Sequence, residues 1–226
     1  MISAKNIVRT FTTGDIVTPV LKGIDVSVQE GEFVAIMGKS GAGKSTLLYQ
    51  LSVLDEPTSG SVLVNGVDVV ALNEKEKTSF RLNTLGYVFQ NYALVPDLSS
   101  EENVMLPLLM GGHKSDEARM VARLAIDAVG LVGKYSNLPA QLSGGEQQRI
   151  SIARAVAGKP KILFADEPTA NLDSVSGVQI IELLAQLNRE NKQTVVMVTH
   201  EREYALGCDR IIHMEDGLVT DIELLK

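Results

Sequence analysis

A glycine-rich loop occupies residues 38–46, which read Gly38-Lys39-Ser40-Gly41-Ala42-Gly43-Lys44-Ser45-Thr46. The residues before it, Phe33-Val34-Ala35-Ile36-Met37, form a continuous apolar run that predicts a buried strand. After it, Leu47, Leu51 and Leu54 recur at the spacing of one helix face. The loop matches the pattern G-x-x-x-x-G-K-[ST] and lies between a strand and a helix, the context that gives this pattern its meaning. The sequence therefore predicts a phosphate-binding loop in an α/β protein.

The chemistry of this loop suits the phosphates of a nucleoside triphosphate. Its glycines let the backbone approach closely, and its N–H groups and the start of the following helix supply donors for an anion. Lys44 adds a full positive charge, and the hydroxyl of Ser45 is placed to ligate Mg²⁺. The loop residues that we expect at the nucleotide are Gly38, Ser40, Gly41, Ala42, Gly43, Lys44, Ser45 and Thr46.

The tetrapeptide Asp-Glu-Pro-Thr occurs twice, at residues 55–58 and 166–169. The first copy lies between a helical segment and a Ser-Gly pair, so we expect a surface turn there. The second follows the apolar run 162–165 and should project from the carboxyl end of a buried strand, where ligands bind in open α/β sheets. We expect Asp166 to organise Mg²⁺ and Glu167 to act as the general base toward the attacking water.

Short apolar runs predict the remaining sheet. The runs at 87–89, 162–165 and 195–198 alternate with helical patterns, as expected of a mostly parallel sheet covered on both faces. No comparable run occurs between about residue 91 and residue 158. We therefore expect a core of residues 1–90 and 159–226, interrupted by an α-helical lobe of residues 91–158.

Two helices are predicted inside this lobe. The first is opened by Ser115 and closed by Gly130. Its apolar stripe consists of Val121, Leu124, Ala125 and Ala128. The second begins near Ser143, a plausible N-cap, and is stopped by Gly158 and Pro160. Its glycine-containing start leaves backbone donors free to face a second anion, although such a start taken alone is more often only a capped helix.

The composition excludes several classes of protein. Of 226 residues, 45% are hydrophobic and 22% charged, which is enough apolar material for a sizeable core and excludes global disorder. The formal net charge of −7 disfavours nucleic acid as a partner. No apolar stretch is long enough to span a bilayer, and no export leader is recognisable, so we expect a cytoplasmic chain. The single cysteine, Cys208, is expected to be a buried small residue without a disulfide partner.

The order of the motifs resembles that of ATP-binding-cassette ATPases over nearly the whole chain. After the phosphate loop come Gln90, the run Leu142-Ser143-Gly144-Gly145-Glu146-Gln147-Gln148-Arg149, Asp166-Glu167, Asn171-Leu172-Asp173 and His200. Within that superfamily, the segments 91–96 and 102–108 are similar to those of MacB-type and lipoprotein-releasing exporters, and less similar to the cell-division ATPase FtsE. The resemblance implies a P-loop (RecA-like) core, an N-terminal antiparallel β subdomain and an inserted helical subdomain.

The resemblance also implies roles for particular residues. Gln90 looks like the glutamine that reaches Mg²⁺ and water and shifts with the transport partner, whereas without the family it would be a solvated strand end. His200 resembles the histidine that contacts the γ-phosphate; a capping or surface role is the alternative. Asp173 looks like the acid that communicates between two sites. Phe11 aligns with the aromatic residue that stacks on adenine, where tyrosine is common, or else belongs to the core. Glu146 stands where glutamine is usual.

The implied activity is hydrolysis of ATP with Mg²⁺ by a head-to-tail homodimer. The helix start Ser143-Gly144-Gly145 of one copy would close over ATP held by the loop of the other. The motion would pass, near residues 90–107, to a separate integral membrane permease, which would hold the chain on the inner face of the cell membrane. The cargo would be a lipoprotein, lipid, peptide or drug.

Three other functions share parts of this pattern. An FtsE-type ATPase that regulates cell-wall hydrolysis without moving a substrate is the principal alternative. A DNA-maintenance ATPase needs a long heptad insertion that the sequence lacks. A ribosome-acting cassette protein usually carries two cassettes in one chain, and this chain has one.

Overall fold

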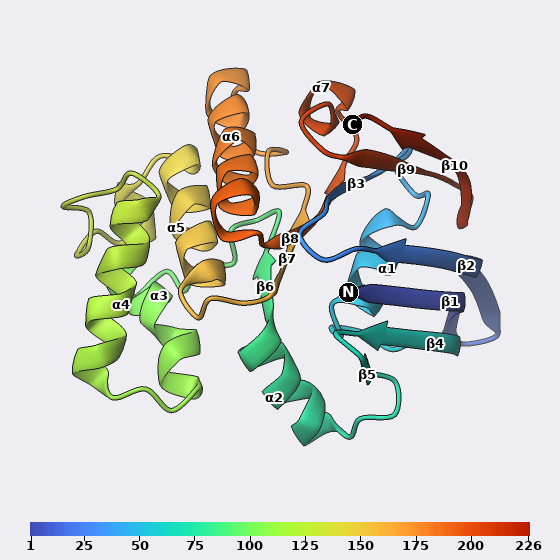
Figure 1. Ribbon diagram of the computed structural model, residues 1–226. Coiled ribbons are helices and arrows are strands. Elements are labelled where there is room, and N and C mark those ends of the chain that lie inside the picture. The colour runs from blue at the N-terminus through green and yellow to red at the C-terminus, as the bar shows by residue number, and fades with distance from the viewer.

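The computed structural model describes all 226 residues and contains two β-sheets with helices packed around them (Figure 1). The strands are β1 (Ile2–Thr13), β2 (Ile16–Val28), β3 (Phe33–Met37), β4 (Ser59–Val64), β5 (Val67–Asp68), β6 (Leu85–Val88), β7 (Ile162–Asp166), β8 (Thr194–Thr199), β9 (Arg210–Glu215) and β10 (Leu218–Leu224). The helices are α1 (Lys44–Leu51), α2 (Glu74–Thr84), α3 (Ser100–Met110), α4 (Ser115–Ala128), the 3-10 turn η1 (Pro139–Gln141), α5 (Gly144–Val156), α6 (Ser174–Asn191) and α7 (Arg202–Ala205).

The larger sheet has the strand order β10-β9-β3-β8-β7-β6; the five strands from β9 to β6 are parallel, and β10 pairs antiparallel with β9. All residues of β3, β7 and β8 are buried, because helices or the second sheet cover both faces. Alternate residues of β3 therefore enter different cores: Ala35 joins the cluster on the α3–α6 face, and Val34 and Ile36 join the one beneath the N-terminal sheet. This confirms the predicted α/β class.

The N-terminal sheet is antiparallel, with the order β2-β1-β4-β5, and it lies at the opposite end of the molecule from helices α3 to α5 (Figure 1). Its inward side chains, such as Ile7, Leu21 and Ile24, are fully buried against α1 and the large sheet. The far end of the β1–β2 hairpin is exposed. The β subdomain implied by the resemblance is therefore present.

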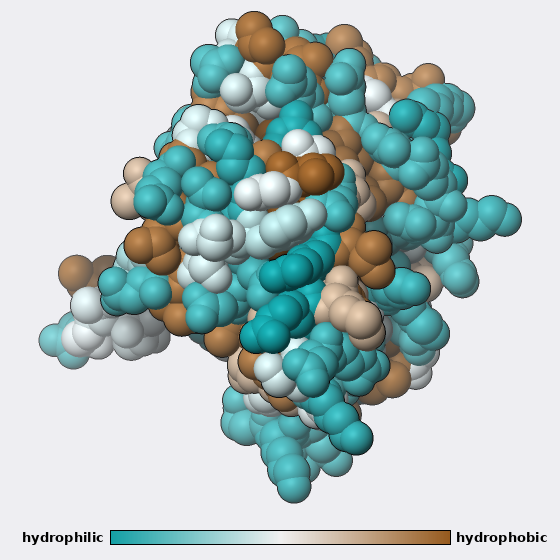
Figure 2. Space-filling view, turned by 90° about the vertical axis from the view of Figure 1, so that its left-hand side faces the viewer, coloured by the Kyte–Doolittle hydropathy of each residue, from teal (hydrophilic) through white to brown (hydrophobic).

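Helix α4 is present as predicted, but its most deeply buried residues are not those of the predicted stripe. Its bounds agree with the predicted helix, but the residues buried in the core are Ala118, Ala122 and Ile126, whereas Leu124 of the predicted stripe is 69% exposed. The sequence pattern favours the larger leucine and valine, but the short alanines let α4 pack closely against α3 and α5. Figure 2 views this end of the molecule and shows apolar patches separated by hydrophilic side chains.

Helix α1 is shorter than predicted. It ends at Leu51, and Val53 adopts a left-handed backbone with φ 62° that stops the helix, so Leu54 lies outside it and is exposed. The first Asp-Glu-Pro-Thr copy follows in a turn, as predicted. Its Asp55 accepts a hydrogen bond from Arg9 at 2.7 Å, and Glu56 pairs with Lys77. None of the helices combines the length and apolar character needed to cross a bilayer.

Candidate nucleotide-binding site

The glycine-rich loop connects the carboxyl end of β3 to the start of α1. Gly41 and Gly43 have φ values of 82° and 93°, which only glycine adopts readily. A Cβ on Gly38 would lie 2.2 Å from the carbonyl oxygen of Met214, so a larger residue cannot occupy that position. No side chain caps α1 at Gly43, and its first N–H groups are therefore available to an anion. The loop has the form of a phosphate cradle.

Lys44 is held inside this cradle. Its side chain is only 6% exposed, and its Nζ donates a hydrogen bond to the carbonyl of Lys39 at 3.1 Å across the loop. The same Nζ lies 3.9 Å from Oε1 of Glu167. A cation this well buried, with one distant carboxylate and one carbonyl as partners, retains donor capacity for phosphate oxygens.

Ser45 and Asp166 meet at the end of β7. Ser45 Oγ donates to Asp166 Oδ1 at 2.8 Å, and Asp166 is almost completely buried. Burial raises the pKa of the Asp166 carboxyl, and the hydrogen bond from Ser45 offsets this only in part. These oxygen donors are of the kind that Mg²⁺ prefers, so the residues present fit a magnesium site.

The two tyrosines beside Asp166 were not predicted as site residues. Tyr49 lies on α1 and Tyr87 on β6, with ring centroids 6.2 Å apart. Tyr87 Oη is buried and has no hydrogen-bond partner. Burial raises the pKa of this phenol, and the negative charge of the nearby Asp166 carboxylate raises it further. No sequence signal distinguishes Tyr49 and Tyr87 as site residues, because aromatic residues in a helix and in an apolar strand are expected in the hydrophobic core.

Glu167 follows Asp166 in a left-handed backbone conformation with φ 42°. The left-handed conformation costs roughly 1–2 kcal/mol. It is held by the Glu167 N–H, which donates to the Val198 carbonyl of β8 at 3.0 Å. The carboxylate then lies between Lys44 and His200, with Oε2 3.3 Å from His200 Nδ1. The geometry places a carboxylate and an exposed imidazole at one end of the phosphate cradle.

A cavity of about 590 Å³ collects these groups, and it is lined by Met37, Gly38, Lys39, Ser40, Lys44, Glu167, His200 and His213. Lys39 and His213 were not predicted as site residues. His213 lies on β9, and its Nε2 is 3.1 Å from Glu223 Oε2. Its approach to the loop depends on the pairing of β9 with β3, which no local pattern around residue 213 indicates.

The other predicted residues lie outside this cavity. Ser143 is the N-cap of α5, and its side chain and that of Glu146 form a reciprocal capping box. Glu146, which replaces the usual glutamine, also pairs with Lys134 at 3.2 Å. Gly144 and Gly145 open the helix. The structure does not bring this helix start to the cavity of its own chain.

Phe11, Gln90 and Asp173 are likewise separate from the cavity. Phe11 is 42% exposed on β1, with the Arg9 guanidinium over its ring at 4.5 Å from the centroid. Gln90 is exposed just after β6. Asp173 is the N-cap of α6 and accepts a hydrogen bond from the N–H of Ser176 at 2.9 Å, which lowers its pKa.

A network joins the loop after Gln90 to α5 and to the turn before α6. Arg154 of α5 donates to the carbonyls of Tyr92 at 2.8 Å and Ala93 at 2.5 Å, both of which have left-handed backbones. Asn171 donates to the Gln90 carbonyl at 2.9 Å. The segments that carry the predicted motifs are therefore physically connected.

The comparison with known families supplies the identity. A model of the ABC transporter family matches residues 21–170, which include the phosphate loop, Gln90, the Ser143–Gly145 helix start and Asp166-Glu167. The chain belongs to the ABC transporter family. It is an ABC ATPase with an ATP-binding cassette.

Similar proteins extend the match over nearly the whole chain. The lipoprotein-releasing system ATP-binding protein LolD of Syntrophotalea carbinolica is 44% identical over 220 residues, 97% of each chain. The macrolide export ATP-binding/permease protein MacB of Rhodopirellula baltica is 45% identical over 98% of this chain, which spans only 33% of that relative. The dimeric ATP-binding cassette MJ0796, bound to ADP and Pi after hydrolysis, has a TM-score of 0.93 and 42% identity, covering 100% of this chain and 99% of that one.

Proposed function

We propose that this ABC ATPase hydrolyses ATP to drive a separate permease of the LolD/MacB type. The observation that supports this most directly is the position of the Glu167 carboxylate, between Lys44 and His200 and at one end of an uncapped phosphate cradle. A carboxylate there serves a reaction at the terminal phosphate, because Lys44 fixes where that phosphate lies.

The proposed roles follow from the contacts. Lys44 and the N–H groups of the loop bind the β- and γ-phosphates, and Lys44 stabilises the charge that develops on them. Glu167 accepts a proton from the water that attacks the γ-phosphorus, while the bond from that phosphorus to ADP breaks. His200 holds the Glu167 carboxylate in place and can donate to a γ-phosphate oxygen.

We propose that Ser45 and Asp166 hold Mg²⁺, which neutralises phosphate charge when bound. Gln90 would join these ligands when its loop moves inward. Phe11 would stack on adenine with the ring face that Arg9 leaves open.

We further propose that two copies assemble head to tail. The α5 start at Ser143, Gly144 and Gly145 does not line the cavity of its own chain, so a second copy would be needed to bring its backbone donors to a nucleotide. Asp173, exposed at the start of α6, would lie near the second site. The dimeric MJ0796 cassette supports this arrangement by its similarity.

Substitution of Glu167 by glutamine tests the base and the dimer together. The variant should bind ATP but hydrolyse it at least 100-fold more slowly, because a positioned base contributes about 10² to 10⁴ in rate. It should also double in mass with Mg-ATP by light scattering, since a repulsive charge is removed. Glu56→Gln, in the duplicate tetrapeptide, is the matched control and should retain hydrolysis. A fully active Glu167→Gln enzyme would contradict the assignment.

The permease and the location of the chain are also proposals. Residues 91–158 would form the lobe that contacts the permease, holding the chain on the inner face of the cell membrane. The apolar residues that the sequence offers for that contact are Tyr92, Leu94, Val95, Leu98, Leu106 and Leu108. Of these, Leu108 is buried, Leu94 packs against the core, and only Val95 is exposed. Val95→Asp is therefore the better probe: it should lose a permease captured from native membranes while ATPase activity and melting temperature stay unchanged.

The export and FtsE-type functions differ in what stimulates hydrolysis. Stimulation by a lipid, lipoprotein or peptide in membranes that contain the captured permease supports export. Low basal activity that rises only with a cell-wall hydrolase complex supports the FtsE-type function. The similarity to LolD and MacB favours export.

A further inference from the structure

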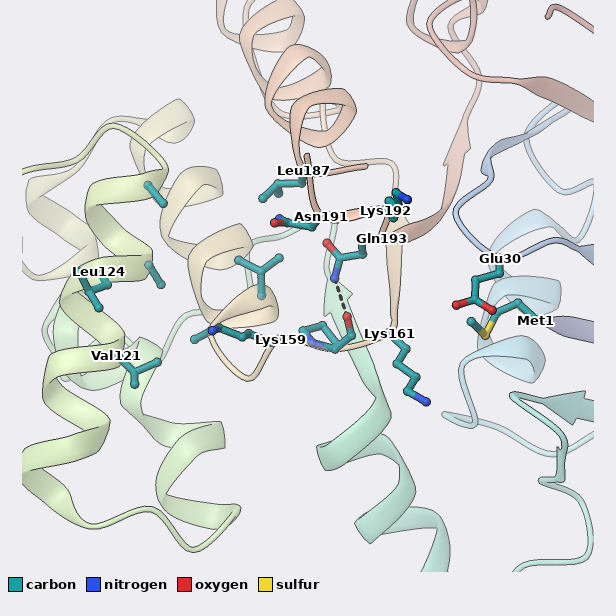
Figure 3. Close-up of a pocket in the computed structure, with 15 residues that line it drawn as sticks. Met1, Glu30, Val121, Leu124, Lys159, Lys161, Leu187, Asn191, Lys192 and Gln193 are labelled. Carbon is teal, nitrogen blue, oxygen red and sulfur yellow. Dashed lines mark hydrogen bonds between the residues drawn. The ribbon is translucent and has the colours of Figure 1, made fainter. Parts of the chain in front are cut away.

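A groove of about 700 Å³ lies at the edge of the large sheet where β7 and β8 begin, which is opposite the edge that carries the phosphate loop. Helix α4 forms one side and the C-terminal ends of α5 and α6 form the other (Figure 3). Eight of its fifteen lining residues are hydrophobic, and none of them lines the nucleotide cavity. The proposed chemistry therefore leaves this groove without a role.

Helix α4 presents a second apolar face to this groove. The stripe that the sequence pattern singled out lines the groove with Val121, Leu124, Ala125 and Ala128. Val121 and Ala125 also pack against the core, whereas Leu124 and Ala128 are exposed. The spacing of these residues, three, one and three, is that of a helix face prepared to pack on another helix. Val156 and Leu187 stand opposite. A helix that already packs one apolar face in the core is not stabilised by a second apolar face in water. Such a second face therefore indicates a surface that a partner covers.

The groove is also basic, in a chain whose net charge is −7. Lys159, Lys161 and Lys192 are exposed along it, and none of them has an acidic partner within 4.0 Å, while Glu30 is the single acidic residue of the lining. Figure 3 shows Lys159 extending toward α4, and Lys161 and Lys192 leaving on different sides of the loops that start the strands.

Two of these lysines occupy positions where the backbone favours glycine. Lys159 and Lys192 have φ values of 51° and 50°, just after the ends of α5 and α6. A basic residue near a helix C-terminus interacts well with the helix dipole, but it does so in the last turn without a left-handed backbone.

The walls of the groove are fixed in place. Gln193 is buried at the start of β8 and donates from Nε2 to the Pro160 carbonyl at 2.8 Å, which ties the α6–β8 loop to the α5–β7 loop (Figure 3). A preformed surface loses less entropy on binding than a mobile one.

We propose that this groove docks an amphipathic helix of another polypeptide, with acidic side chains flanking its apolar stripe. The apolar residues of that helix pack between α4 and Leu187, and its carboxylates meet Lys159, Lys161 and Lys192. Apolar anchors at helical spacing supply the affinity. The lysines reject basic or neutral helices and so set the specificity. Docking at this edge leaves the nucleotide cavity accessible.

A photo-crosslinker tests the proposal in the full chain within its own cells. Benzoylphenylalanine replaces Leu124, and the crosslinked peptide is sequenced by mass spectrometry. The expected product is one polypeptide segment with apolar residues at helical spacing and acidic residues beside them. The matched control places the same group at Val132, which is 72% exposed after α4 and does not line the groove. Ala128 serves as a second groove position if the Leu124 variant melts at a lower temperature.

Charge reversal of the three lysines then tests whether they contribute to docking in addition to the apolar contacts. The triple variant Lys159→Glu, Lys161→Glu, Lys192→Glu should lower the crosslink yield at least tenfold while ATPase activity stays at the wild-type level. A synthetic peptide of the captured segment should bind at least tenfold more weakly when its acidic residues become glutamine. A crosslink to phospholipid, to a second copy of this chain or to a basic segment would overturn the proposal, as would equal labelling at Val132, no product, or a yield unaffected by the triple variant.

Discussion

Replacing Arg154 with methionine should loosen the loop after Gln90. The guanidinium holds the Tyr92 and Ala93 carbonyls, and both residues are in left-handed conformations that they would not keep unaided. Methionine keeps the straight side chain and the helix propensity of α5 but donates no hydrogen bond. Any change therefore reports on the two contacts with the loop.

The magnitude follows from those contacts. Two hydrogen bonds from a charged donor are worth about 2 kcal/mol each. Relaxation of two strained residues returns about 1 kcal/mol each. The net loss of local stability is then about 2 kcal/mol, which corresponds to roughly 30-fold more frequent opening of the loop.

Amide hydrogen exchange over residues 89–96 measures that opening. The control is Arg149→Met on the same helix, which loses contacts to the Val129 carbonyl and Gln179 but none to the loop. It should leave exchange at 89–96 unchanged. Exchange in the Arg154 variant within twofold of wild type, or an equal effect of the Arg149 variant, would refute the role given to Arg154.

Three further outcomes are expected. Lys44→Ala should weaken ATP binding more than tenfold in a nucleotide titration, because it removes the buried cation of the phosphate loop; an affinity within twofold of wild type would contradict this. Asn103→Ala should lower the free energy of unfolding by about 3 kcal/mol in urea, since the fully buried amide bonds four backbone groups of the loop and helix start around it; a loss below 1 kcal/mol would speak against it. Glu223 has a pKa lowered to about 2 by Arg202 and His213, so its contribution to stability is present above pH 4.5 and lost as the pH falls toward 2. The difference in melting temperature between wild type and Glu223→Gln should accordingly shrink over that interval, and a constant difference would count against the pairing.

The parts of the site that the sequence predicts are those specified by a few adjacent residues. The phosphate loop needs glycines and a lysine at fixed spacing, and the Ser143–Glu146 capping box needs two residues three apart. Asp166 lies at the carboxyl end of β7, as predicted, because the apolar run of four residues directly before it indicates a buried strand that ends at the polar pair. The geometry of each of these features is determined by residues that are close together in the sequence.

The remaining features depend on partners far away in the chain. Tyr49 and Tyr87 reach Asp166 only through the packing of α1 and β6 against β7, and Arg154 reaches the loop 61 residues before it. The apolar stripe of α4 lies on one helix face, as predicted, but the sequence pattern does not indicate which of its residues pack against the core. Both faces of α4 are apolar, and the alanines that pack in the core give a weaker hydrophobic signal than the leucine that does not.

The core on the α3–α6 face runs without a break from the sheet into the helical lobe: Val88 and Leu163 of the sheet, Val104 of α3 and Ile150 of α5 belong to one cluster. A shortened chain that joins residues 1–90 directly to 159–226 would keep α6 but lose the cover that α3 and α5 give to this side of the sheet, and such an exposed apolar surface favours aggregation. The lobe is therefore unsuited to removal or exchange as a separate module. Protein engineers who wish to insert a reporter should use the exposed Gly14-Asp15 tip of the β1–β2 hairpin, where nothing within 4 Å meets an added side chain at Gly14 and the hydrophobic clusters are undisturbed.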